Sequence, residues 1–115
     1  MNRMDFRSRK IEELIKIKLS SLLLKGLKDP RLDSFITILD VVLSKDGRSA
    51  KIVVSVIGTV EEQNSVIDGL RSARGYIQKR LSKQIRMKYF PHLLFILDTQ
   101  TEERVRLVHK INEGE

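Results

Sequence analysis

The sequence predicts a two-layer α+β fold, in which a three-stranded sheet is covered by helices on one face. A stripe of apolar residues with helical spacing opens the chain, and two β-branched segments then flank an Asp-Gly turn. A second helical stripe follows, with a short apolar run after it. The resulting order is helix, strand, strand, helix, strand, helix. Because the chain has 115 residues, one domain spanning 1–115 is expected.

The first helix is predicted from about residue 5 to residue 25. Its apolar stripe follows the i, i+3, i+4 spacing and consists of Ile11, Leu14, Ile15, Leu19, Leu22 and Leu23. Gly26 provides a stop, and Asp29-Pro30 supports it because the residue before a proline avoids the helical region. The stretch "DPR" is therefore expected to form a structured turn, with a functional role for Arg31 as the alternative.

The next two segments predict a β-hairpin. Both "FITILDVVLS" (35–44) and "SAKIVVSVIG" (49–58) are rich in β-branched residues, which is typical of strands. Asp46-Gly47 lies between them and favours a tight turn. Asp40 and Lys51 interrupt the apolar runs, as expected for an antiparallel pair in a sheet with one wet face.

The second long helix contains a conflict between its apolar stripe and one arginine. Glu61 and Glu62 lie near its start, where the helix dipole favours negative charge. The stripe consists of Val66, Ile67, Leu70, Ala73, Ile77, Leu81 and Ile85. In an unbroken helix Arg74 would point into this stripe, where an unpaired guanidinium is costly. Either the Arg74 side chain extends out to solvent along its aliphatic stem, or the helix bends, and Gly75 favours a bend.

The C-terminal part of the chain predicts one more strand and one more helix. Phe90-Pro91 forces extended backbone, and "HLLFILD" (92–98) suits a strand covered on one or both faces. Thr99 and Glu102 have capping-box spacing for a last helix over about 100–112. The apolar side of that helix would consist of Val105, Leu107, Val108 and Ile111.

Positive charge is concentrated in two blocks of a chain whose net charge is +7. Residues 1–31 carry nine Lys or Arg against four Asp or Glu, and residues 69–97 carry seven against none. The intervening residues 32–68 carry three against six, and residues 98–115 carry three against five. Such asymmetry favours an anionic partner, the alternative being a basic surface that serves solubility alone.

No motif indicates catalysis, a metal or a membrane. The chain has no cysteine, which excludes disulfides and thiolate ligands, and His92 and His109 lack a metal-site context. Phosphate-loop, dinucleotide-binding and hydrolase motifs are missing. No apolar run approaches the ~20 residues of a spanning helix, and the N-terminus has no signal core. We expect a cytoplasmic, non-enzymatic protein without a metal, a cofactor or a small-molecule substrate.

Four segments together resemble the ribosome-binding factor A family. In chain order they are "KDPRL", "VVLSKDGRSAKIVVS", "LRSARG" and "RMKYFPHLLFILD", within a resemblance that covers about residues 7–111. The resemblance implies a KH-like domain of type II, with the order α-β-β-α-β and an extra C-terminal helix. RNA-binding KH domains carry a GXXG loop that clamps the nucleic-acid backbone. The family instead has a kink, which here falls on Ala73, Arg74 and Gly75.

This kink would resolve the conflict at Arg74. We expect Gly75 to absorb the backbone change and the bend to turn Arg74 toward the solvent side that carries Lys79 and Arg80. The chain departs from the family pattern at Gly47, Lys88 and Phe90.

The resemblance also implies a function. Family members are bacterial assembly factors that bind the free or immature small (30S) ribosomal subunit and assist late maturation of 16S rRNA at its 5′ end, especially in the cold. The implied mechanism is selective binding of one rRNA conformation by a monomer, without catalysis. The residues expected to bind RNA are Arg7, Arg9, Lys10, Arg71, Arg74, Lys79, Arg80, Lys83, Arg86 and Lys88.

Two other functions remain open from the residues alone. One is a general KH-type module for single-stranded RNA or DNA, although four Phe and two Tyr supply few aromatic side chains for base stacking. The other is a protein–protein module whose basic face meets an acidic partner.

Overall fold

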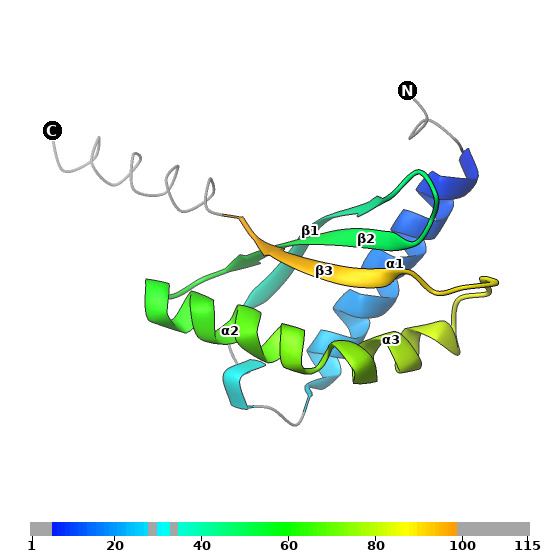
Figure 1. The fold of residues 1–115 in the computed structure, drawn as a ribbon. Helices are drawn as coiled ribbons and strands as arrows, with labels where there is room; N and C mark the ends of the chain where they lie inside the picture. Colours follow the sequence, from blue (N-terminus) through cyan, green and yellow to red (C-terminus); the bar gives the residue numbers. More distant parts are fainter. Residues whose placement is uncertain (1–5, 28–29, 33–34, 99–115) are drawn as a thin grey trace, which may run out of the picture.

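The computed structural model describes residues 6–27, 30–32 and 35–98, and this part of the chain forms an α+β fold (Figure 1). Its elements in chain order are α1 (Phe6–Lys25), the 3-10 helix η2 (Pro30–Leu32), β1 (Ile36–Leu43), β2 (Ser49–Val56), α2 (Val60–Ser72), α3 (Arg74–Ser82) and β3 (His92–Leu97). The predicted fold class is confirmed. The predicted helix over 100–112 and its capping residues lie outside the described residues.

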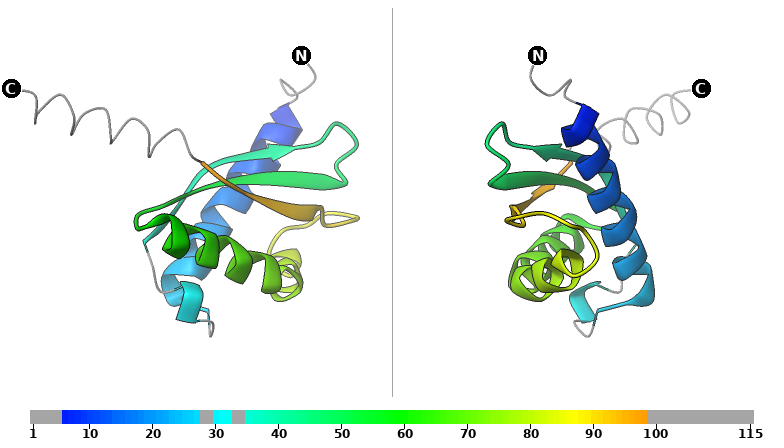
Figure 2. Two further views of the ribbon diagram at one scale, coloured as in Figure 1. Left: turned by 60° about the vertical axis from the view of Figure 1, so that its left-hand side comes forward. Right: turned by 90° about the vertical axis from the view of Figure 1, so that its right-hand side faces the viewer.

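The described strands form a mixed sheet of order β1-β2-β3, and α1, α2 and α3 lie on one side of it (Figure 2). β1 pairs with β2 in antiparallel fashion, and β2 pairs with β3 in parallel. A parallel pair needs a crossover connection, which α2 and α3 provide. The covered face forms the core, where the fully buried side chains include Ile15, Leu19, Ile52, Val54, Leu70, Ile77 and Leu93. Burial of each such side chain contributes about 1.5–3 kcal/mol of hydrophobic stabilisation.

The hairpin between β1 and β2 is closed by the predicted Asp-Gly turn. Gly47 has a φ of 73°, a left-handed conformation that glycine adopts without strain. The Asp46 carboxylate accepts hydrogen bonds from the Ser44 hydroxyl at 2.7 Å and from the Arg48 backbone N–H at 3.0 Å. These two bonds fix the tip of the hairpin and use the Asp46 side chain within the turn.

The outer edge of β1 is covered by side chains of α1. The Leu43 backbone N–H donates to the carboxylate of Glu12 at 2.8 Å, and Glu12 is buried although it lies within a charged helix. One turn later, the Lys16 ammonium donates to the Leu39 carbonyl at 3.4 Å. Polar groups of an edge strand would otherwise remain open to pairing with another chain.

The outer edge of β3 is covered in the same way by α2 and α3. The Leu93 backbone N–H donates to the Gln78 side-chain carbonyl at 2.8 Å. The Arg71 guanidinium donates to the Phe95 carbonyl at 3.2 Å. Both outer strands of the sheet are therefore tied to a helix by polar side chains as well as by apolar packing.

The interruption between α2 and α3 lies at Ala73, one turn residue with φ −86° and ψ 0°. Gly75 was expected to absorb the backbone change, but it lies inside α3 and its φ is not positive. Hydrogen bonds from Ala73 N–H to the Gly69 carbonyl (3.0 Å) and from Ile77 N–H to the Ala73 carbonyl (2.9 Å) continue across the interruption. The kink is therefore a local interruption at Ala73, and apolar residues of both α2 and α3 still pack into the same core.

Gly69 fixes the position of η2 on α2. A Cβ atom at Gly69 would lie 3.1 Å from Leu32 Cδ2 and 3.2 Å from Arg31 Cβ, which is closer than ordinary van der Waals contact. The absence of a side chain at Gly69 lets the buried Leu32 reach α2. The "DPR" turn, of which the structure describes Pro30 and Arg31, thus has a packing role against the second helix.

Candidate nucleic-acid interface

A cleft of about 630 Å³ opens where three segments meet: the start of α1, the β1–β2 turn, and the segment between α3 and β3. These segments lie together at the right-hand end of the molecule in Figure 1. We define the basic cleft by six cationic side chains that line it, which are Arg7, Lys10, Lys45, Arg48, Arg86 and Lys88. All six are exposed. The two basic blocks of the sequence therefore meet in space at this end of the fold.

The basic cleft has little negative charge to balance these cations. Asp46 is the one carboxylate among its lining residues, and its oxygen is used by the hairpin turn. The hydrogen bond from the Arg48 backbone N–H, followed by that from the Ser44 hydroxyl, lowers the pKa of Asp46. Six cations facing one engaged carboxylate produce a positive potential that attracts phosphate groups.

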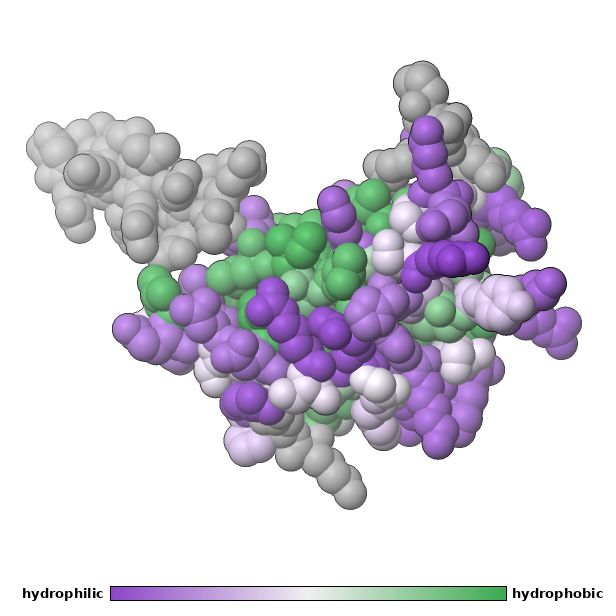
Figure 3. Space-filling view, in the orientation of Figure 1, coloured by the Kyte–Doolittle hydropathy of each residue, from purple (hydrophilic) through white to green (hydrophobic). Residues whose placement is uncertain are grey.

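Apolar residues hold the segment that delivers Arg86 and Lys88. Ile85 is 4% exposed, Met87 packs against the core, and Pro91 is fully buried. Arg86 and Lys88 lie between these anchors and are exposed, so the two cations reach the cleft from a segment attached at both ends. Figure 3 shows hydrophilic side chains at this end of the molecule and hydrophobic ones on the uncovered sheet face.

Several residues predicted to bind RNA lie outside the basic cleft. Arg9 points to a second hollow on the other flank of α1, where Glu12, Glu13 and Asp40 are its neighbours. The Arg71 guanidinium is engaged by the carbonyl of Phe95. Arg9 therefore lies close to carboxylates, and Arg71 is bound to a backbone acceptor.

Arg74 was expected to turn toward solvent, but its side chain does so only in part. Its side chain is half-buried, and its Nε atom is enclosed without a hydrogen-bond partner. The reason is the position of the bend, because an interruption at Ala73 leaves Arg74 in the first turn of α3, close to the apolar contacts of that helix. The apolar stripe and the charged side chain share this turn.

Lys79, Arg80 and Lys83 form an exposed group at the end of α3, outside the lining of the basic cleft. Arg80 lies over the Tyr76 ring, 5.9 Å from its centroid, and donates to the Tyr76 hydroxyl at 3.4 Å. α3 contains no acidic residue, so these cations have no carboxylate within their own helix.

Lys45 and Arg48 line the cleft but were not among the predicted residues. They lie in the acidic block 32–68, whose net charge does not indicate a basic surface. The available signal was "KDGR", a turn sequence with a cation on each side. Its proximity to the start of α1 comes from tertiary packing.

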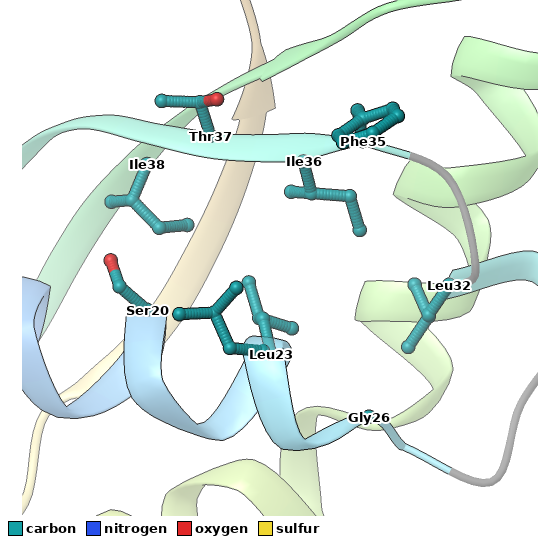
Figure 4. A pocket seen from close by; sticks show the side chains of 9 residues that line it. Ser20, Leu23, Gly26, Leu32, Phe35, Ile36, Thr37 and Ile38 are labelled. Atoms are coloured by element: carbon teal, nitrogen blue, oxygen red, sulfur yellow. The ribbon is translucent and has the colours of Figure 1, made fainter.

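An apolar cavity of about 470 Å³, separate from the basic cleft and from the hollow at Arg9, lies between the end of α1 and the start of β1 (Figure 4). Its lining is apolar or uncharged and consists of Ser20, Leu23, Leu24, Gly26, Leu32, Phe35, Ile36, Thr37 and Ile38. Without a cation, this cavity offers no group that would select an anionic ligand.

The described residues form neither of two other kinds of site, a metal centre or a membrane span. Within residues 6–27, 30–32 and 35–98, no group of three or more His, Cys, Asp or Glu side chains is arranged to hold a metal ion. No helix in this part of the chain has the length and apolar character needed to cross a membrane.

The fold and the basic cleft define a small α+β protein whose charge suits a polyanion. The sequence matches the family model described as ribosome-binding factor A over residues 7–111. It is 35% identical over 113 residues to ribosome-binding factor A of Caldanaerobacter subterraneus subsp. tengcongensis, covering 98% of this chain and 93% of the relative. The chain belongs to the ribosome-binding factor A family.

Solved structures agree with this assignment. The solution structure of a Thermotoga maritima protein, a putative ribosome binding factor A, has a TM-score of 0.69 and 36% identity, covering 79% of this chain and 86% of that one. A Thermus thermophilus ribosome binding factor A model, fitted into a cryo-electron-microscopy map of a complex with 30S, has a TM-score of 0.56 and 27% identity. That match covers 75% of this chain and 93% of the other.

Proposed function

We propose that this protein binds the small ribosomal subunit through phosphates of 16S rRNA, with the basic cleft as the principal contact. The observation that carries the proposal is the set of six exposed cations facing one engaged carboxylate. Membership of the ribosome-binding factor A family supports the choice of partner, as does the 30S complex formed by the Thermus relative. Arginine contributes bidentate contacts to phosphate and lysine contributes point charges, so the cleft combines geometric and purely electrostatic binding.

The proposed mechanism is selective binding without catalysis. Phosphate contacts fix where a protein sits on RNA, so a rigid set of cations favours the rRNA conformation whose phosphates match its spacing. A factor that binds one conformation more tightly raises the population of that conformation by its differential affinity. We propose that this shift assists late maturation of 16S rRNA at its 5′ end, with the largest effect in the cold.

The proposal covers the chain as a single KH-like RNA-binding domain that acts as a monomer in the cytoplasm. Lys79, Arg80 and Lys83 on α3 are proposed as additional phosphate contacts beside the cleft, because they are exposed and their helix carries no acid in its first turn. Arg9, Arg71 and Arg74 are proposed to contribute less, because their neighbours are carboxylates, a carbonyl oxygen and the core.

A triple substitution tests the cleft: Arg48→Gln, Arg86→Gln and Lys88→Gln. Affinity for purified small subunits is expected to fall roughly tenfold to hundredfold, because each exposed ion pair contributes up to about 1 kcal/mol. The slope of log affinity against log salt should fall by about 2 to 3, since three phosphate contacts are lost. Sedimentation of the protein with purified 30S subunits at several salt concentrations measures both quantities.

The matched control removes the same charge elsewhere: Arg9→Gln, Lys25→Gln and Lys51→Gln. All three control residues are exposed and none lines the cleft. Both triple variants should keep the unfolding free energy within about 0.5 kcal/mol of the parent protein, as is usual for surface positions. Equal loss of subunit binding in the two variants would show that net charge alone acts, and would overturn the assignment to the cleft.

A further inference from the structure

One aromatic side chain stands out at the rim of the basic cleft. Tyr89 lines the cleft and is 74% exposed. Its neighbours in sequence are anchored, since Phe90 packs against the core and Pro91 is fully buried. The backbone that carries Tyr89 is therefore held in place while its ring projects into solvent, so an interaction with the ring costs little loop ordering.

Packing does not account for the position of this ring. A tyrosine usually buries its apolar body and leaves the hydroxyl at the surface. The ring of Tyr89 instead has the Lys88 ammonium 5.7 Å from its centroid and is otherwise largely in solvent. The second tyrosine, Tyr76, is less exposed, and it both contacts Arg80 and accepts a hydrogen bond from it. Tyr89 is thus an open aromatic face beside a row of cations.

We propose that Tyr89 stacks an unpaired nucleobase of an RNA strand whose phosphates occupy the basic cleft. This inference rests on the proposed function and specifies the form of RNA that the cleft takes. Successive nucleotides of a single strand present a phosphate and a base to the same surface, so cations beside an aromatic ring can bind both.

The same arrangement discriminates against duplex RNA. In an A-form helix the bases are paired and stacked on one another, so their faces are not available to a protein side chain. Duplex RNA can use the cations of the cleft but not the ring of Tyr89. The binding free energy therefore has two contributions. The cations attract the phosphates of any RNA, and the ring of Tyr89 stacks only on the bases of a single strand.

Tyr89→Ala separates these two contributions. The probes are a single-stranded oligouridylate of about 12 nucleotides, which lies within the size range of single-strand sites, and an A·U duplex of equal length. Fluorescence anisotropy at about 0.1 M salt gives both affinities, at an ionic strength where surface charges still act. The substitution is expected to weaken single-strand binding roughly 5- to 100-fold and to leave duplex binding unchanged. Tyr89→Phe, which keeps the ring, should bind the single strand as the parent protein does.

Intrinsic fluorescence gives a second readout, because the chain has two tyrosines and no tryptophan. In a Tyr76→Phe background, emission comes from Tyr89 alone, and stacking of uracil on the ring should quench it as oligouridylate is added. Saturating oligouridylate that leaves the emission unchanged would overturn the proposal.

The controls distinguish this inference from the proposed function. Tyr76→Phe should leave both affinities unchanged, because Tyr76 does not line the cleft and the substitution keeps the ring that contacts Arg80. If Tyr89→Ala binds the single strand as well as the parent protein does, while the cleft triple variant loses binding to subunits, the stacking is wrong and the proposed function stands. If neither variant loses binding, both are wrong.

Discussion

The two flanks of α1 use charge in opposite ways. On one flank, Arg7 and Lys10 line the basic cleft with four more cations and one carboxylate that the hairpin turn engages. On the other, Arg9 and Lys16 line a smaller hollow of about 220 Å³ together with three carboxylates. Lys10 and Arg9 are adjacent in sequence, so the number of charges in this part of the chain does not decide whether a cation faces the cleft. The residues that surround each cation in the folded protein decide it.

The second flank serves the fold. Glu12 and Lys16 lie one turn apart on α1 and bind a backbone N–H and a carbonyl of β1, respectively. A charge that satisfies a backbone group is no longer free to attract a distant ligand. The comparison therefore predicts that substitution of Glu12 or Lys16 changes stability, whereas substitutions in the cleft change RNA binding.

The largest effect is expected for Glu12→Ala. The Leu43 N–H would lose its acceptor in a buried position, and an unsatisfied buried group costs about 1–3 kcal/mol. Urea denaturation of the purified protein measures the loss. Glu12→Gln retains a carbonyl oxygen at this position and should be destabilised less than Glu12→Ala. If Glu12→Ala were as stable as the parent protein, this flank would have no fold-stabilising role.

A smaller effect separates Lys10→Ala from Arg9→Ala. Lys10→Ala should weaken small-subunit binding up to about fivefold, the equivalent of one exposed ion pair of up to ~1 kcal/mol. Arg9→Ala should leave that affinity nearly unchanged, because carboxylates surround this residue in its hollow. Co-sedimentation with 30S subunits at low salt compares the two. A greater loss for Arg9→Ala would reverse the assignment of the flanks.

The smallest effect is expected from Asp46, the carboxylate of the basic cleft. Its folded-state pKa lies below the ordinary value of 3.8, so its contribution to stability is present above that value and is lost as the pH falls through the folded-state pKa. Asp46→Asn has no such group to titrate. The parent protein should therefore lose slightly more thermal stability below this value than Asp46→Asn does. Thermal melting followed by circular dichroism across this acidic range detects the difference, and coincident curves for the two proteins would contradict it.

Most of the architecture could be predicted because it follows from local pattern. The apolar stripe of α1, the Asp46-Gly47 turn and the apolar run of β3 each specify an element without reference to the rest of the chain. The capping box at the start of α2, in which Thr59 and Glu62 bind each other's backbone N–H groups, was readable in the same way but was missed.

The parts that could not be predicted depend on contacts between distant segments. The bend lies at Ala73 and not at Gly75, although helix propensity alone favours an interruption at glycine. Gly75 has open space around a hypothetical Cβ, whereas Gly69, which no pattern singled out, has Leu32 against it. Propensity identified the helix that bends, and tertiary packing decided the residue.

The sequence predicted that the candidate site is basic, but it predicted only some of the residues that line it. The density of cations in 69–97 pointed to Arg86 and Lys88, both of which line the cleft. Whether a particular cation faces the cleft, as Arg48 does, or a strand carbonyl, as Arg71 does, depends on the docking of the hairpin and helices on the sheet. One-dimensional charge patterning does not contain that information.

The side chains that cover the two outer strands also determine how the molecule comes apart. Glu12 of α1 and Gln78 of α3 each bind a backbone N–H of an outer strand. Detachment of either helix would break this hydrogen bond as well as apolar contacts, which couples the opening of each helix to the sheet. Brief detachment of either helix is also the step that exposes a strand able to pair with a second chain. Resistance to self-association therefore depends on how rarely α1 or α3 opens.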